Sequence, residues 1–260
     1  MNELRKPSLI SPLCRIGNKY YDRHHIIPYI PNHKCYVELF VGSGSIFFNK
    51  KKAESNILND LDKSIIEYFR MLKVVSNDWT KYPELDTLLK IKKYWNEIPL
   101  TVEYKLVHEI IKFGYGFGSK PVIKESAIYR ERKPLIKLKK YLLKWQDNLQ
   151  DVILEEEDYA DIIKKYDSID TFFFLDPPYE NTDKSFKYAQ DKDFSFTRLL
   201  DEVKKINGKF LMTINDSPFI ENLFKDFNIM KIMAINKFRN GRKGKDRKEL
   251  LISNYELQMN

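Results

Sequence analysis

Short apolar runs that end in a turn of small, acidic or proline residues recur along this chain. They occupy residues 35–40 (Cys-Tyr-Val-Glu-Leu-Phe), 56–60 (Asn-Ile-Leu-Asn-Asp) and 171–175 (Thr-Phe-Phe-Phe-Leu). An apolar run of about four to eight residues is typical of a strand that is buried on both faces of a parallel sheet. The pattern therefore predicts three such strands, with distinctive residues at or just beyond their carboxyl ends.

Segments with helical spacing of apolar residues lie between these strands. Residues 62–72 place Ile65, Ile66, Phe69 and Leu72 on one face of a predicted helix. Residues 150–260 alternate again between strands and helices and end in a predicted hairpin. This alternation predicts an α/β fold.

Residues 73–149 interrupt the alternation and are mostly helical by the same criterion. The exception is 112–119, where three glycines alternate with aromatic residues and predict a loop or hairpin; a helix resumes at 135–149. A chain of 260 residues is long enough for one α/β domain with an insertion. We therefore expect one domain built from 1–72 and 150–260, with 73–149 inserted into it.

Composition excludes several other classes of protein. The chain has no apolar run of about 18 residues that could span a membrane, and residues 1–6 lack the apolar core of a signal peptide. Its two cysteines, Cys14 and Cys35, make neither a metal cluster nor a disulfide framework. We expect a cytoplasmic protein with no membrane partner and no metal.

The net charge of +8 is concentrated in two segments. Residues 73–150 hold 16 Lys and Arg against 9 Asp and Glu, and residues 237–248 hold 7 against 1. Basic segments on a mildly acidic body are typical of proteins that bind a polyanion. The alternative is lysine spread over solvated faces, which fits the run at 237–248 less well because that run mixes Arg with Gly.

The tetrapeptide Asp176-Pro177-Pro178-Tyr179, directly after the predicted strand at 171–175, is the strongest chemical signal. Open α/β sheets bind their ligands at the carboxyl ends of the strands. The prolines make the turn rigid and leave its carbonyls free to accept hydrogen bonds. A carboxylate, a carbonyl and an aromatic ring together suit a planar amino group, such as the exocyclic amine of a nucleobase. The alternative is a proline-rich turn that only closes the strand.

A glycine turn, Val41-Gly42-Ser43-Gly44-Ser45, follows the strand at 35–40, and a helix-like stretch is expected from Ile46. This arrangement brings backbone close to a ligand at a helix N-terminus. The strand at 56–60 ends in Asp60, and in nucleotide-binding folds an acid at this place binds ribose hydroxyls. The alternatives are a plain tight turn for the glycines and a helix cap for Asp60.

The order and spacing of these segments resemble the Dam-like D12 class of N6-adenine DNA methyltransferases over about 15–72 and 150–256. The resemblance implies a Rossmann-like fold that binds S-adenosylmethionine (AdoMet), with a mixed, mostly parallel sheet and helices on both faces. It implies that 73–149 is a mainly helical lobe that recognises the DNA target. By resemblance the catalytic residues are Asp176, Pro177, Pro178 and Tyr179. The AdoMet-binding residues are Gly17, Asn18, Lys19, Phe40, Gly42, Ser43, Gly44, Asp60, Asp158, Tyr159 and Asp176.

The inserted segment does not match the family's usual sequence-reading region, so the recognised DNA sequence does not carry over. Candidate DNA-binding residues come instead from the two basic segments. They are Lys112, Tyr115, Lys120, Tyr129, Arg130, Arg239, Arg242, Lys243 and Arg247. The expected partner is double-stranded DNA, and the related enzymes imply a monomer or loose dimer. Whether a cognate restriction endonuclease exists is left open.

The chemistry that these residues support is transfer of a methyl group to an amine. Adenine N6 is a poor nucleophile, and acceptors for both of its hydrogens, at Asp176 and the Pro177 carbonyl, would aim it at the methyl group. The base must leave the duplex to react. Methylation of RNA, methylation of cytosine N4 and a non-catalytic DNA-binding role are the alternatives that the sequence leaves open.

Overall fold

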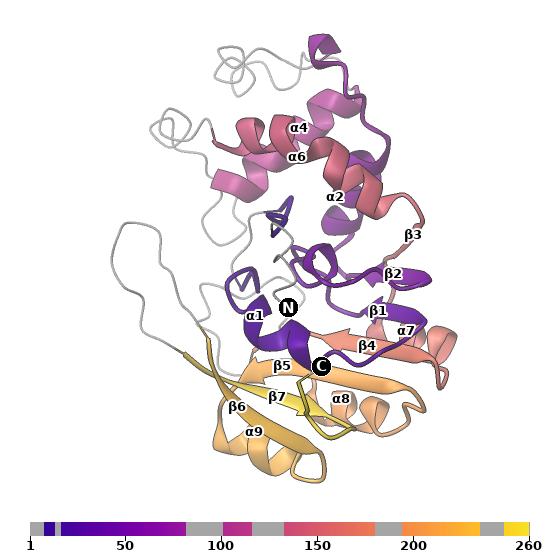
Figure 1. Cartoon of the computed structure of the whole chain (residues 1–260), viewed down its shortest axis with the longest axis vertical. Coiled ribbons are helices and arrows are strands. Elements are labelled where there is room, and N and C mark those ends of the chain that lie inside the picture. Colours follow the sequence, from indigo (N-terminus) through magenta and orange to yellow (C-terminus); the bar gives the residue numbers. More distant parts are fainter. Residues whose placement is uncertain are drawn as a thin grey trace, which may run out of the picture.

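The computed structural model describes residues 8–13, 17–81, 101–115, 133–179, 194–234 and 247–259. Its centre is a seven-stranded sheet in the order β3-β2-β1-β4-β5-β7-β6, counted over these residues (Figure 1). The strands are β1 Cys35–Glu38, β2 Ser55–Asn59, β3 Val152–Glu155, β4 Thr171–Leu175, β5 Lys209–Asn215, β6 Asn228–Ala234 and β7 Arg247–Ser253. Neighbouring strands from β3 to β5 are parallel, while β7 is antiparallel to both β5 and β6. The predicted strands, the mixed sheet and the closing hairpin are therefore confirmed.

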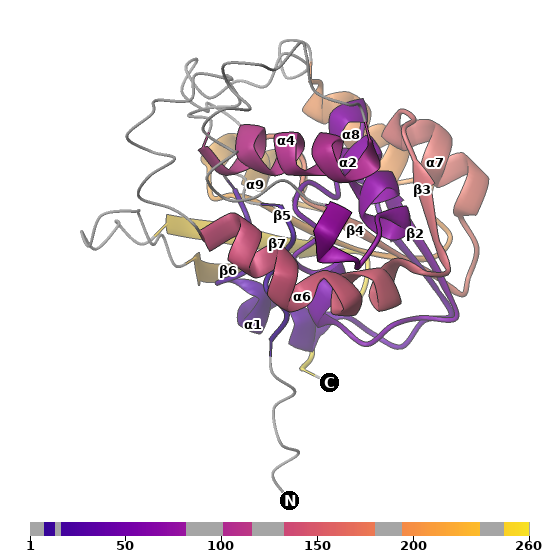
Figure 2. The same cartoon turned by 90° about the horizontal axis from the view of Figure 1, so that it is seen from above.

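Helices cover both faces of the sheet, as predicted. The α-helices are α1 Arg23–Ile26, α2 Lys63–Val74, α4 Val102–Tyr115, α6 Lys133–Leu149, α7 Tyr159–Tyr166, α8 Phe196–Val203 and α9 Pro218–Leu223. Short 3-10 helices lie at Ile27–Tyr29, Phe47–Asn49 and Trp79–Lys81. Figure 2 shows α1 on one side of the strands and α7 and α8 on the other.

The alternation of side chains along the central strands produces two cores. In β4, Phe172 and Phe174 point into the core that α2, α4 and α6 line. Phe173 and Leu175 point into the core beneath α7, α8 and α9. All four side chains are buried, which explains why the strand reads as an uninterrupted apolar run in the sequence.

The helix predicted at 62–72 is α2, and local chemistry sets its start. The Asp62 side chain accepts a hydrogen bond from the Ser64 N–H and caps the helix. The predicted apolar face is fully buried. Helix α6 likewise confirms the helix predicted at 135–149.

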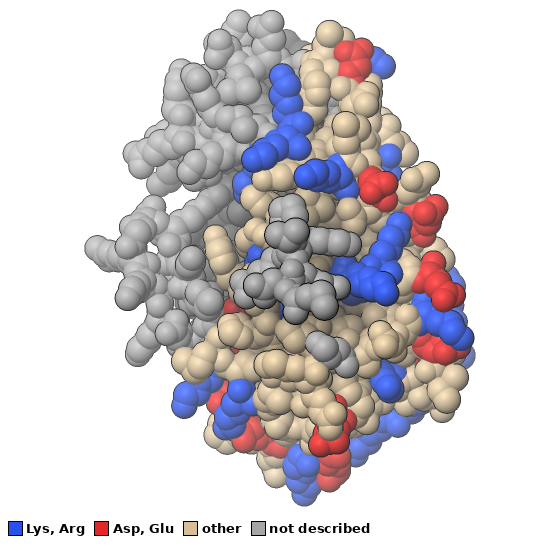
Figure 3. All heavy atoms as spheres, viewed as in Figure 1, with Lys and Arg blue, Asp and Glu red and all other residues tan. Residues whose placement is uncertain are grey.

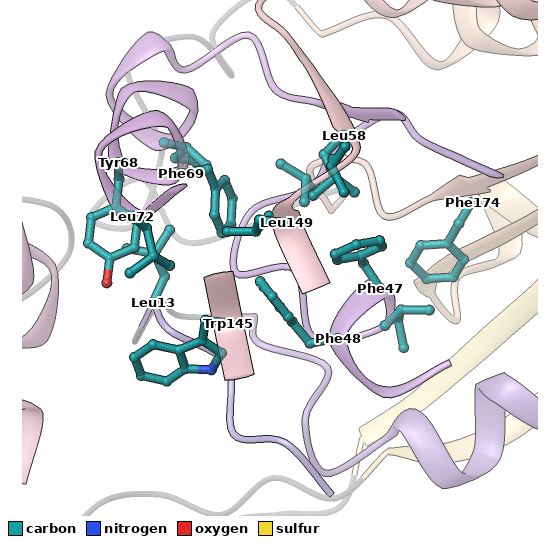
Figure 4. Close-up of a cluster of buried hydrophobic side chains, with 14 of the residues drawn as sticks. Leu13, Phe47, Phe48, Leu58, Tyr68, Phe69, Leu72, Trp145, Leu149 and Phe174 are labelled. Carbon is teal, nitrogen blue, oxygen red and sulfur yellow. The ribbon is translucent and has the colours of Figure 1, made fainter. Parts of the chain in front are cut away.

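The helices α4 and α6 lie within the predicted insertion and pack on α2 of the α/β domain. Figure 1 shows the three helices grouped at one end of the molecule, and Figure 4 shows Trp145 and Leu149 of α6 beside Leu13, Phe48 and Leu72. The Trp145 indole N–H also donates to the Ile10 carbonyl at 2.8 Å. The described part of the insertion thus shares a core with the domain that carries it, and the domain division stays a prediction.

The helix-like stretch predicted after the glycine turn forms, but it is only one turn long. The chain forms only the 3-10 turn Phe47–Asn49 and is extended at Lys50. The reason is local: the Asn49 side-chain amide donates to the Ser45 carbonyl at 2.9 Å, the carbonyl that the Asn49 backbone would use in an α-helix. The Asn49 N–H turns to Ile46 instead.

The break predicted at 112–119 was also wrong for its first half, because α4 continues through Gly114 to Tyr115. A glycine inside a helix costs only about 1 kcal/mol relative to alanine, which packing of α4 on α2 can offset. Residues 116–132 lie outside the described part of the chain. Among the described helices, none has the length and apolar character needed to cross a bilayer.

The packing of α6 yields a stability prediction. Trp145→Ala removes a large buried side chain and its hydrogen bond, and we expect the free energy of unfolding to fall by about 3–5 kcal/mol. Leu143→Ala, on an exposed position of the same helix, is the control and should change it by less than about 0.5 kcal/mol. Urea denaturation measures both; equal effects would show that α6 does not belong to the core.

Candidate active site

The carboxyl ends of the parallel strands bring the predicted motifs to one edge of the sheet. The glycine turn follows β1, Asp60 follows β2, and Asp176 follows β4. The Asn59 side chain ties two of these segments together, because its amide donates to the Leu39 carbonyl and to the Glu157 carbonyl, each at 3.0 Å. Its oxygen accepts from the Glu157 N–H. Sequence analysis gave Asn59 no such role.

The glycine turn has the backbone geometry that its composition predicts. Gly42 and Gly44 have φ values of 48° and 69°, which favour glycine. A Cβ on Gly42 would meet no heavy atom of the described residues within 4 Å, so these residues leave space against this turn. The Asp60 carboxylate accepts from the Gly42 N–H at 2.9 Å through one oxygen and from the Asp62 N–H at 2.9 Å through the other.

Asp60 is therefore not the helix cap that was its alternative reading, since Asp62 caps α2. Its carboxylate is fixed beside Gly42 and half-buried. A carboxylate accepts hydrogen bonds at several positions on its two oxygens, including bonds from hydroxyl groups. This is the donor and acceptor chemistry that a ribose would meet at this place.

An aromatic wall lies next to the turn. The Phe40 ring contacts the rings of Tyr159 at 5.6 Å and Phe194 at 5.9 Å between centroids. Sequence analysis singled out Phe40 and Tyr159 but missed Phe194, which is far away in the sequence and belongs to no motif. Flat rings beside a polar turn suit the face of a purine.

Asp158 has more hydrogen-bond partners within the protein than the sequence suggested. It caps α7 by accepting from the Ala160 N–H at 2.9 Å, and Arg198 of α8 binds both of its oxygens at 2.7 and 3.0 Å. The Arg198 guanidinium also lies over the Tyr159 ring, 4.9 Å from its centroid. The predicted contact between Asp158 and the adenine of AdoMet stays a prediction, and it would have to share this carboxylate with Arg198.

The N-terminal motif divides between two parts of the site. Gly17 has a φ of 82°. The Asn18 side-chain oxygen accepts from the Tyr20 N–H and from the Ser45 hydroxyl of the glycine turn. Lys19 extends to the Asp176–Tyr179 turn, and its predicted contact with the cofactor stays a prediction.

Lys19 joins the two polar side chains of that turn. Its ammonium lies 2.8 Å from Asp176 Oδ1 and donates to the Tyr179 hydroxyl at 2.7 Å, with a longer contact of 3.4 Å to the Gly17 carbonyl. Only 4% of Lys19 is exposed. Three acceptors match the three hydrogens of an ammonium group, so the side chain has one well-defined position.

The charged groups of this cluster shift one another's pKa values. Burial by itself would lower the pKa of Lys19, but Asp176, Tyr179 and Glu249 outweigh it and raise that pKa well above its usual value. Burial raises the pKa of Asp176, while Lys19 and the Thr213 hydroxyl oppose that rise. Lys19 therefore stays charged at neutral pH and favours the ionised form of Asp176.

The contacts of Asp176 orient its carboxylate. Oδ1 receives both Lys19 and the Thr213 hydroxyl of β5, the latter at 2.9 Å. Within the described part of the chain, no hydrogen bond reaches Oδ2. The side chain keeps 20% of its surface exposed. Oδ1 is thus held by the protein through two partners.

A second group of titratable residues lies deeper, beneath the glycine turn. The Tyr36 hydroxyl donates to the buried Glu38 at 2.8 Å, and burial raises the pKa of Glu38 to about 8. Burial lowers the pKa of Lys50, which lies over the Tyr36 ring, to about 7. Tyr36 and Glu38 are buried, so they belong to the support of the site rather than to its exposed surface.

Several predicted DNA-binding residues cannot be placed. Lys120, Tyr129, Arg130, Arg239, Arg242 and Lys243 lie outside the described residues. Lys112 and Tyr115 are on the last turn of α4, and Arg247 is the first residue of β7; their side chains are not described. Pro177 is buried, and Pro178 is half-buried in the turn between Asp176 and Tyr179.

Comparison with known proteins identifies the family. The model of the D12 class N6 adenine-specific DNA methyltransferases matches residues 16–103 and 125–238. The modification methylase StsI of Streptococcus sanguinis is 24% identical over 97% of this chain, which spans 44% of that protein. The type II methyltransferase M1.LlaDCHI of Lactococcus lactis subsp. cremoris is 23% identical, with 89% of each chain covered.

Among solved structures, a SAM-dependent O-methyltransferase of Thermotoga maritima aligns with a TM-score of 0.42 and 8% identity, over 92% of this chain and 66% of that one. The family match covers most of the chain. The protein is a methyltransferase, and it belongs to the D12 class of N6 adenine-specific DNA methyltransferases. Its methyl donor is AdoMet, whose adenosine the open glycine turn, Asp60 and the aromatic wall fit by their chemistry.

The position of Asp60 yields a binding prediction. Asp60→Ala removes a charged acceptor, and we expect the Kd for AdoMet to rise about 10- to 100-fold, as the loss of one hydrogen bond to a charged group implies. Asp62→Ala is the matched control: it should lower stability by about 1 kcal/mol through the lost cap and leave the Kd unchanged. Isothermal titration calorimetry measures both, and equal Kd values for the two variants would contradict the assignment.

Proposed function

We propose that this protein transfers the methyl group of AdoMet to N6 of an adenine flipped out of duplex DNA, within a specific sequence. The observation that carries the proposal is the Asp176 carboxylate, which Lys19 and Thr213 hold through Oδ1 and whose side chain keeps part of its surface exposed. An exocyclic amine needs an acceptor in this orientation. The family match supports adenine as the base.

The residues of the turn act on the amine together. Asp176 Oδ2 accepts one N6 hydrogen and the Pro177 carbonyl accepts the other, which places more electron density on the nitrogen. The Tyr179 ring stacks on the base, a contact that contributes about 1–3 kcal/mol on other base-binding platforms. Lys19 holds Asp176 and Tyr179 in a fixed relation, so little reorganisation is needed when the base arrives. When bound, AdoMet supplies a methyl group on a sulfonium, which is a good leaving group.

The direct test is to express the protein in cells and identify modified bases in their DNA and RNA by mass spectrometry and sequencing. We expect N6-methyladenine in DNA at one recurring sequence. N4-methylcytosine in DNA, or methylation confined to RNA, would contradict the proposal. An inactive Asp176→Ala protein expressed in the same cells controls for the host's own methylation.

Asp176 itself should be required for the chemical step. We expect Asp176→Ala to lower kcat about 100- to 1,000-fold, because a preorganised acceptor of the reacting amine is lost. The Kd for AdoMet should change less than about threefold. Asp161→Ala, an exposed carboxylate on α7, is the control and should keep full activity. A residual rate above about a tenth of wild type would exclude the assigned role.

The DNA is expected to meet the protein above this edge of the sheet. Strand β7 begins next to the end of β5. Asn215, the last residue of β5, pairs with Glu249, and the Asp216 N–H donates to the Lys248 carbonyl. Ala234 and Arg247, the described residues on either side of the gap that contains most of the basic segment 237–248, pair with each other at the ends of β6 and β7. We assign this segment to phosphate contacts.

Residues 73–149 are assigned to reading the DNA sequence. Lys139, Lys140 and Lys144 of α6 are exposed, which supports a DNA-facing role. Figure 3 shows Lys and Arg side chains over α6 on the face of the molecule that it views. The proposal places the enzyme in the cytoplasm as a monomer or loose dimer. A cognate restriction endonuclease is the protein partner to test for.

Phosphate contacts give affinity and salt dependence without sequence information. Neutralising Arg239, Arg242, Lys243 and Arg247 together should weaken binding to all duplexes alike. It should flatten the slope of log affinity against log salt concentration by up to roughly 3–4 units if all four contact phosphates. The methylated sequence should stay the same. Fluorescence anisotropy at several salt concentrations measures the slope; an unchanged slope would remove this segment from the DNA interface.

A further inference from the structure

The central strand β5 carries one hydroxyl group within an otherwise apolar stretch. Its residues 210–214 are Phe, Leu, Met, Thr and Ile, and all five are buried. The threonine, Thr213, has no exposed surface. Valine would fill nearly the same space without a hydroxyl, and burying a hydroxyl is costly unless it is hydrogen-bonded. The presence of threonine at this position therefore calls for a physical reason.

The register of the sheet brings Thr213 to the Asp176–Tyr179 turn. The parallel strands β4 and β5 pair as far as Leu175 with Met212. The next residue of β5 is Thr213, and the residue that follows β4 is Asp176. A side chain of the sheet can therefore hold the first residue of the turn directly.

The Thr213 hydroxyl has one hydrogen to donate and two acceptors near it. It lies 2.9 Å from Asp176 Oδ1 and 3.4 Å from the Leu175 carbonyl oxygen. The shorter contact is also the one to a carboxylate, and a hydrogen bond to a charged group is roughly twice as strong as one between neutral groups. The hydrogen is therefore directed to Asp176.

Lys19 and Thr213 reach the same oxygen from different parts of the fold. The Lys19 ammonium, 2.8 Å from Asp176 Oδ1, comes from the segment before α1, whereas Thr213 belongs to the centre of the sheet. The last torsion of an aspartate side chain has broad minima, so one donor leaves the plane of the carboxylate poorly defined. Two donors from separate elements fix that plane.

We propose that Thr213 is a positioning residue for methyl transfer: its hydroxyl, held by β5, orients the Asp176 carboxylate toward the target amine. The inference rests on the proposed function, which assigns Asp176 as the acceptor of that amine. Thr213 acts on the reaction through Asp176. A fixed acceptor needs no reorganisation when the base arrives, and small errors in the placement of a catalytic group lower the rate strongly.

The test removes the hydroxyl in two ways in the full-length protein. Thr213→Val keeps the shape of the wild-type side chain, and Thr213→Ala differs from Thr213→Ser by the hydroxyl alone. We expect kcat on duplex DNA to be about 10- to 100-fold lower for Val than for wild type, and for Ala than for Ser, as loss of a hydrogen bond to a charged group implies. The Kd for AdoMet and the KM for DNA should change less than about threefold.

A packing role and a positioning role predict opposite orders of activity. If Thr213 only filled space, Val would be the better replacement, because Ser leaves a cavity. If the hydroxyl positions Asp176, Ser should be more active than Val. Thr171→Val is the matched control: Thr171 is a buried threonine at the start of β4, where its hydroxyl donates to the Tyr166 carbonyl at 2.7 Å. It should lower stability and leave kcat unchanged.

A measurement without DNA tests the route through Asp176. Loss of a donor to the charged carboxylate should raise the pKa of Asp176, because the ionised form is stabilised less. Carbon-13 NMR of labelled aspartate carboxyl groups measures this pKa in wild type and in Thr213→Val, and the signal that Asp176→Ala lacks identifies the residue. The other titratable groups that interact with Asp176, which both proteins share, are Lys19, Tyr179, Glu249 and Glu38.

Three results would overturn the inference alone, with the wild-type protein active on adenine. They are wild-type kcat in Thr213→Val, a kcat for Ser no higher than that for Val, and an unchanged or lowered pKa of Asp176. If Thr213→Val cannot be purified folded, the comparison of Ser with Ala decides. Failure of all three variants to fold would also overturn the inference, because Thr213 would then serve the stability of β5. A wild-type protein that makes no N6-methyladenine would overturn both the inference and the proposed function.

Discussion

The ion pair between Lys19 and Asp176 is the interaction on which the arrangement of this site depends. Removing one member of a buried pair typically costs about 3–5 kcal/mol, because the other charge is left without compensation. Lys19 lies just before the first helix, and Asp176 lies much later in the sequence, directly after β4. The pair therefore also fixes the first helix against the end of β4. Because Lys19 binds Tyr179 as well, one buried ammonium determines where the carboxylate and the ring of the Asp176–Tyr179 turn lie.

The same pair gives the two oxygens of Asp176 different tasks. Oδ1 is bound by Lys19 and Thr213, and Oδ2 is the oxygen that we assign to the adenine amine. A carboxylate held in this way is already oriented before substrate binds, and preorganisation of this kind is a major source of catalytic power. The cofactor side follows the same principle, since backbone and side-chain hydrogen bonds fix the glycine turn and Asp60 relative to each other.

The inserted segment is structurally less separate than its sequence suggests. Leu106 of α4 and Leu138, Leu142, Trp145 and Leu149 of α6 belong to the same buried cluster as β1 and β4. A movement of these helices would therefore be felt by the core beneath the glycine turn, where Phe48 contacts Phe69 of α2.

The sequence by itself determined the main strands, their burial on both faces and the edge of the sheet at which the candidate site lies. Uninterrupted apolar runs are stable only where they are buried. Residues that follow parallel strands meet at one edge of the sheet, so the sequence alone could predict that Asp60, Asp176 and the glycine turn lie at the same edge. Helix α2 and helix α6 followed from the same kind of periodicity. The prediction of helix length from the sequence was wrong in two places. At Asn49 a local hydrogen bond ends the helical turn, and at Gly114 helix packing outweighs the weak helix preference of glycine.

Only the tertiary structure decided which side chains serve each other. Nothing in the local pattern indicates that Lys19 reaches past the cofactor motif to Asp176, that Thr213 anchors the same oxygen, or that Arg198 occupies Asp158. These partners lie between 37 and 157 positions apart in the chain, and their distances depend on sheet register and helix packing rather than on spacing. Hydrophobic periodicity reports which face of an element is buried; it carries no information about which polar groups meet across the fold.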